Sequence, residues 1–145
     1  MKPADENCGR YQDDSEIKRI VERFEACEFS ADEFKHADHL TVALWYLAHL
    51  PHTAAITRMR DSLVRFTAHH QVTGYHETIT LFWMKLVSAF LKQADRSEPL
   101  HVKANRMLKS FASSKLILEY YSETLLYSTT AKTDWVDPDL KAIGS

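Results

Sequence analysis

The sequence predicts an all-α fold, a compact single-domain bundle of five or six helices with an extended C-terminal tail. Apolar residues recur at the spacing of one helix face through most of the chain. Only three glycines and four prolines occur among 145 residues, which is few for the tight turns of a β-rich fold. A chain of this length buries a core without disulfides or a structural metal. We therefore expect any metal ion to be functional.

The first helix is predicted to end near residue 27. Ser15 is its expected N-cap, with Glu16 in the first turn. The apolar stripe of this helix consists of Ile17, Ile20, Val21 and Phe24. Residues 1–14 are polar and are expected to form a disordered or loosely attached segment before a single helical domain over 15–145.

The second helix is predicted over residues 36–50, where Pro51 ends it. Beside its main apolar stripe it carries Val42, Trp45 and Tyr46. A helix that is apolar on more than one side lies either at the centre of a fold or in a subunit interface. We expect the central position.

The remaining helices follow with short connections. We expect a turn over 71–74 in which Thr73 is the N-cap of the fourth helix. The residues after 121 suggest one or two helical turns and then an extended tail. The ranges expected for the third to fifth helices and a short sixth one are 53–69, 74–94, 97–111 and 113–121.

Charge and cysteine usage exclude several classes of partner and site. The net charge is −2 and the basic residues are interspersed with acids, so we expect no nucleic-acid partner. No apolar run approaches the roughly 20 residues that span a bilayer, and the N-terminus does not resemble a signal peptide. Cys8 and Cys27 are the only cysteines and do not form a C-x-x-C pair. These features predict a cytoplasmic protein without a membrane partner.

Three histidines are set apart by their positions on helix faces. His36 and His39 share the buried face of the second helix with Leu40, and His76 shares a face of the fourth helix with Trp83. All three lie near the N-terminal ends of their helices. If these ends are adjacent in the fold, the three imidazoles converge.

Converging neutral imidazoles are suitable ligands for a divalent metal ion. His36, His39 and His76 would leave one position for water on Zn²⁺, with Fe or Ni as alternatives. Such a centre fits a hydrolase or lyase that acts on a small molecule. Glu77 and Asp38 are the nearest carboxylates and are the candidate catalytic proton shuttles.

Two alternatives use the same residues differently. In the first, the histidines and nearby aromatic residues line a metal-free pocket that binds a small-molecule ligand. In the second, the histidines are structural and the chain is a helical interaction module or a homodimer that associates through Trp45. Four other residues remain open as further members of the site: His69, His70, Asp137 and Asp139.

Three sequence blocks together resemble a family of small uncharacterised bacterial all-helical proteins. The blocks are H-x-x-H-L at 36–40, Y-H-E-T-x-T at 75–80 and W-V-x-P-D-L at 135–140. The resemblance covers most of the chain from about Phe24 onward, whereas residues 1–14 have no counterpart. It implies that the three blocks belong to one structural unit, and it implies no reaction, cofactor or catalytic residue.

Overall fold

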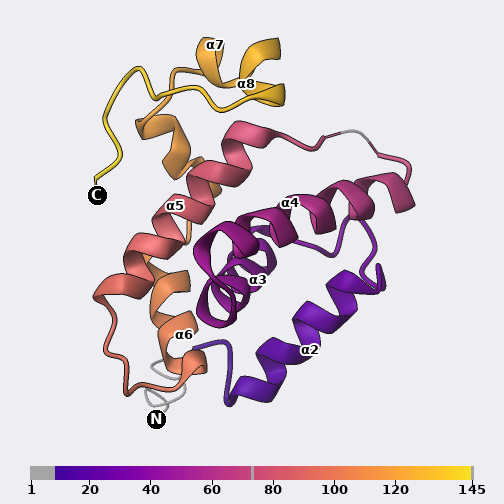
Figure 1. Ribbon diagram of the computed structural model, residues 1–145, viewed down its shortest axis with the longest axis vertical. Coiled ribbons are helices and arrows are strands. Elements are labelled where there is room, and N and C mark those ends of the chain that lie inside the picture. Colours follow the sequence, from indigo (N-terminus) through magenta and orange to yellow (C-terminus); the bar gives the residue numbers. More distant parts are fainter. Residues whose placement is uncertain (1–8, 73, 145) are drawn as a thin grey trace.

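The computed structural model describes residues 9–72 and 74–144 and confirms an all-α single domain (Figure 1). Every regular element of the described residues is a helix, and none of these helices is long and apolar enough to cross a membrane. The elements are α2 (Asp14–Glu25), α3 (His36–His49), α4 (His52–His69), α5 (Glu77–Gln93), α6 (Leu100–Ser110), the 3₁₀ helix η1 (Ser114–Glu119), α7 (Glu123–Leu126) and α8 (Thr129–Thr133).

Helix α3 lies at the centre of the fold, with α2, α4, α5 and α6 packed around it (Figure 1). Leu40 and Leu44 on one side of this helix and Val42 on the opposite side are all buried. This arrangement confirms the expected central position and follows from the wide apolar surface of the α3 sequence.

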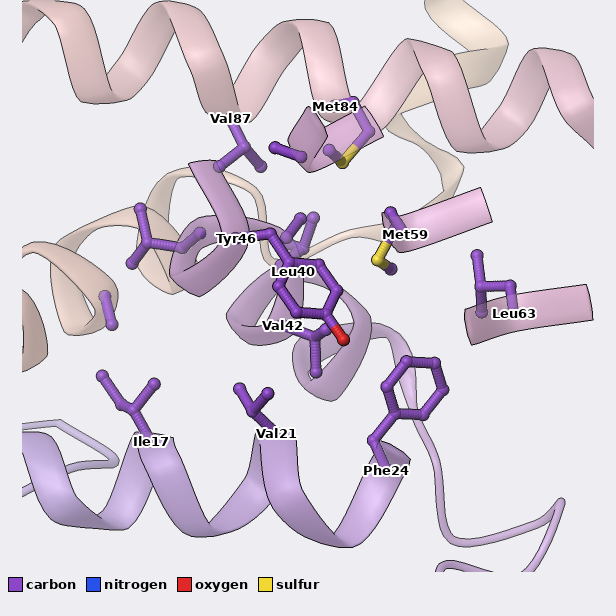
Figure 2. Packing of buried hydrophobic residues seen from close by; sticks show 14 of the residues in the cluster. Ile17, Val21, Phe24, Leu40, Val42, Tyr46, Met59, Leu63, Met84 and Val87 are labelled. Carbon is purple, nitrogen blue, oxygen red and sulfur yellow. The ribbon is translucent and has the colours of Figure 1, made fainter. Parts of the chain in front are cut away.

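The main core forms around α3, from side chains of α2, α3, α4, α5 and α6. Figure 2 shows Ile17, Val21 and Phe24 pointing from α2 toward α3, while Met84 and Val87 of α5 lie on the opposite side of α3. These side chains are buried, so the periodic stripes of the sequence correspond to the packed faces of the helices.

Two helix ends differ from the sequence prediction. Asp13, not Ser15, is the N-cap of α2, and its carboxylate accepts hydrogen bonds from the amides of Ser15 and Glu16. Helix α5 begins at Glu77 with His76 as its N-cap. The expected cap of this helix, Thr73, lies outside the described residues, but the helix starts too late for Thr73 to cap it.

The segment just before α2 is packed on the fold, in contrast to the expected loose attachment. Tyr11 is only 3% exposed, and its hydroxyl lies 2.8 Å from the Thr41 hydroxyl of α3. The amides of Arg10 and Tyr11 both donate to the side-chain carbonyl of Asn105 in α6. Residues 1–8 of the expected segment lie outside the described residues.

The C-terminal part forms a second, smaller core against α5. Phe82 of α5 packs with Ile117, Tyr121 and Leu126, all buried. The tail is fixed by hydrogen bonds, since the Tyr121 hydroxyl donates to the Val136 carbonyl at 2.7 Å. The expected helical turns followed by an extended tail are confirmed.

Candidate functional site

A cavity of about 550 Å³ is lined by residues of α3, α4 and α5, of the connections before α3 and α5, and of η1 and the end of α7. His36, His39 and His76 all line it, and we call it the histidine cavity. The starts of α3 and α5 therefore border the same cavity. Its aromatic walls consist of Phe34, Phe66, Tyr75, Trp83 and Tyr127.

The lining of the histidine cavity carries no charged side chain among the residues that the structure describes. Besides the imidazoles, its polar groups are mainly hydroxyls that already have partners. The Thr67 hydroxyl donates to the Val64 carbonyl at 2.9 Å, and the Thr80 hydroxyl donates to the His76 carbonyl at 2.9 Å. The hydroxyls of Ser114 and Tyr127 belong to exposed residues, so the imidazoles are the main partly buried polar groups of the lining.

His36 is the first residue of α3 and is held in place through its ring. Its Nε2 donates to the backbone carbonyl of Phe111 at 2.8 Å, because a carbonyl oxygen only accepts. The ring also meets Trp83 edge to face, with 4.7 Å between ring centroids. His36 therefore connects α3 to the end of α6 and to α5.

Both ring nitrogens of His76 are engaged. Its Nδ1 accepts from the Ile79 amide at 3.1 Å, which caps α5, and its Nε2 donates to the Leu126 carbonyl at 2.7 Å. These two bonds select the neutral tautomer with hydrogen on Nε2. A metal ion bound at either nitrogen would require one of the bonds to break.

Among the described residues, His39 has neither ring nitrogen in a hydrogen bond, whereas His36 has one and His76 has both. Within residues 9–72 and 74–144, its imidazole has no hydrogen-bond partner, although it packs on Phe34 with 4.3 Å between ring centroids. Burial, with a smaller contribution from the nearby His36, lowers the pKa of His39 to about 4. At neutral pH the cavity therefore contains an uncharged imidazole with an unused donor and an unused acceptor.

Glu77 is held by an arginine and does not line the histidine cavity. Arg60 of α4 binds its carboxylate with both nitrogens of the guanidinium fork, at 3.0 and 2.6 Å. Tyr75 also donates to this carboxylate. The hydrogen bonds from Arg60 lower the pKa of Glu77, whereas burial raises the pKa of Tyr75 to about 12. Glu77 thus joins α4, α5 and the preceding turn.

Asp38 is also engaged in local structure and does not line the cavity. Its carboxylate accepts from the Lys35 amide at 2.9 Å, which satisfies a free donor at the start of α3. Arg10 binds its other oxygen at 3.2 Å. The catalytic roles expected for Asp38 and Glu77 remain predictions, and neither carboxylate reaches the cavity from these positions.

The four residues left open in the sequence analysis lie elsewhere, since none of them lines the cavity. Asp137 accepts from the Trp135 indole at 2.9 Å, and Asp139 accepts from the Ser122 amide at 2.8 Å. His70 packs its ring against Phe66 with 4.5 Å between centroids.

The Trp45 side chain is partly buried against the main core. Its ring contacts the ring of His49, with 4.0 Å between centroids. The homodimer through this side remains a prediction.

Part of the cavity wall was not recognised from the sequence. Met59, Leu63 and Phe66 of α4 form one apolar stripe of the kind that normally packs into a core. A stripe that packs and a stripe that lines a cavity have the same periodicity, so no signal separates them. No pattern in the sequence around Tyr127 predicts that it lines a cavity.

The described residues contain no group of three or more His, Cys, Asp or Glu side chains arranged to hold a metal ion. Comparisons of the chain with protein-family models, curated proteins and solved structures gave no match. The interpretation of the site therefore depends on the geometry of the histidine cavity itself.

Proposed function

We propose that the protein binds a small, uncharged and mainly apolar organic molecule in the histidine cavity, without a metal ion. The observation that carries this proposal is the uncharged lining, in a chain of which 26% of the residues are charged. Pockets for small molecules are typically apolar concavities of roughly 300–1,000 Å³. An ionised ligand would lose its hydration here without gaining a counter-charge.

The rim of the cavity supports the same proposal. Val72 and Tyr127 both line the cavity, yet 41% of Val72 and 64% of Tyr127 is exposed. They are two of the four large hydrophobic side chains that are exposed among the described residues. Exposed apolar side chains beside a cavity are typical of ligand-binding sites. They give an apolar molecule a favourable path of entry.

The test is a titration with 1-aminoanthracene, a neutral fluorescent probe that emits more strongly in apolar surroundings. We expect saturable binding of one probe per chain. The Ala43→Leu variant should weaken binding at least tenfold, because Ala43 lines the cavity and leucine fills part of it. Ala54→Leu, at an exposed position of α4, is the matched control. Equal binding to both variants would place the probe outside the cavity.

The same substitution gives a prediction for stability. Ala43 and Ala55 are both buried, but only Ala43 lines the cavity. Ala55→Leu should cost about 1–3 kcal/mol in the free energy of unfolding because it overpacks the core, whereas Ala43→Leu should cost less than about 0.5 kcal/mol. Urea unfolding measures both values. Equal losses would mean that the space beside Ala43 is filled by packed side chains.

The metal centre at His36, His39 and His76 is the main competing hypothesis. Zn²⁺ at 100 times its dissociation constant would stabilise the folded state by about 2.7 kcal/mol. Because His76 would have to give up a hydrogen bond, we expect no thermal stabilisation by Zn²⁺ and no stoichiometric metal in tag-free protein. One equivalent of metal that is lost in His39→Gln would overturn the metal-free proposal.

A further inference from the structure

Among the three histidines of the cavity, His39 is the one whose two ring nitrogens are both free of hydrogen bonds within the described residues. His36 and His76 use their Nε2 atoms on backbone carbonyls, and His76 also uses its Nδ1. His39 has no hydrogen-bond partner in the part of the chain that the structure describes, and its ring lies against Phe34 inside the cavity. His39 is partly buried, so a ligand hydroxyl that pairs with its ring inside the cavity replaces a weakly hydrated contact and gains affinity.

The charge state of His39 selects the kind of polar group that it binds. Its pKa of about 4 leaves the ring neutral at pH 7, so it provides no positive charge for a carboxylate or phosphate. The uncharged lining provides none either. A neutral imidazole nitrogen is instead a good acceptor for an O–H group.

The walls of the cavity select the rest of the ligand. Aromatic side chains line it from several elements, among them Phe34, Phe66 and Trp83. The thioethers of Met59 and Met84 also line it, and sulfur makes favourable contacts with aromatic rings. Aromatic rings pair favourably with one another in offset and edge-to-face geometry. A flat aromatic ligand therefore fits these walls better than a branched aliphatic one.

Taking the proposed function as the starting point, we propose that the ligand is a neutral phenol-class molecule whose hydroxyl group donates a hydrogen bond to His39. Its aromatic ring lies among the aromatic and methionine side chains of the cavity. A ligand could bind in the cavity without this hydrogen bond, and the following experiment distinguishes the two cases.

The experiment compares three ligands of similar shape as competitors of 1-aminoanthracene: p-cresol, toluene and the anion p-toluate. p-Cresol should bind about tenfold more tightly than toluene, because only p-cresol forms the hydrogen bond. p-Toluate should bind most weakly. In His39→Phe, toluene should keep its affinity and the advantage of p-cresol should disappear. His49→Phe, at an exposed position of the same helix, should keep the preference of the wild type.

Each other outcome has one meaning. If neither the probe nor any competitor binds, the proposed function itself is wrong. If toluene binds as tightly as p-cresol, or if the preference survives in His39→Phe, the cavity binds ligands but the role of His39 is wrong. Tightest binding of p-toluate would overturn the neutral ligand class. His39→Leu serves in place of His39→Phe if the latter does not fold, and the same loss of preference is expected.

Discussion

The His39→Phe variant should resist acidification better than the wild-type protein. In the unfolded chain His39 has a pKa of 6.5, and in the folded protein the pKa is about 4. Between these values the unfolded state binds more protons, so the stability contributed by the neutral ring is complete above pH 6.5 and falls as the pH falls. The shift corresponds to at most about 3 kcal/mol, of which about 2 kcal/mol should be lost between pH 7 and pH 4.5.

Urea unfolding of the wild type and the variant at pH 7 and pH 4.5 measures this difference. Other groups titrate in both proteins, so the relevant quantity is the difference between their two pH dependences. His49→Phe is the matched control, because His49 is exposed on the same helix, and it should keep the pH dependence of the wild type. An identical pH dependence of His39→Phe and the wild type would show that the folded state does not lower the pKa of His39.

The His76→Ala variant should lose about 2–3 kcal/mol of folding free energy. It removes the N-cap of α5, which is worth about 1 kcal/mol, and the bond to the Leu126 carbonyl, worth about another 1 kcal/mol. Leu126 is fully buried, so its carbonyl has little water available to replace the imidazole.

His76→Asn separates the two contributions. Asparagine is a good N-cap, so it should recover about 1 kcal/mol of the loss without restoring the contact to Leu126. His52→Ala, at the exposed first residue of α4, should change stability by less than about 0.5 kcal/mol. Unchanged stability of His76→Ala in urea unfolding would mean that the ring is free for another role, such as metal binding.

The helices could be predicted from the sequence because their apolar periodicity is strong, but two of their caps could not. Ser15 is a good N-cap residue, yet Asp13 two positions earlier forms the cap with two backbone amides. His76 caps α5 although histidine is not a preferred cap, and its bond to Leu126 fixes its ring. At α2 two good cap residues stand close together and local preference does not separate them, whereas at α5 a tertiary contact holds the capping ring in place.

That the three histidines line one cavity could be anticipated from helix geometry, but their chemical environments could not. The partners of His36 and His76 are carbonyls 75 and 50 residues away in the sequence. The arginine that binds Glu77 lies 17 residues before it, on another helix. No spacing rule covers such contacts, and they decide which polar groups remain available to a ligand.

The most direct test of the central claim is methyl NMR of protein labelled with ¹³C at the methionine methyl groups. Met59 and Met84 line the histidine cavity, whereas Met107 is buried in the main core and does not line it. Addition of p-cresol should shift the Met59 and Met84 signals saturably and leave the Met107 signal in place. Unchanged Met59 and Met84 signals, or an equally large shift of Met107, would contradict the binding of an uncharged small molecule in this cavity.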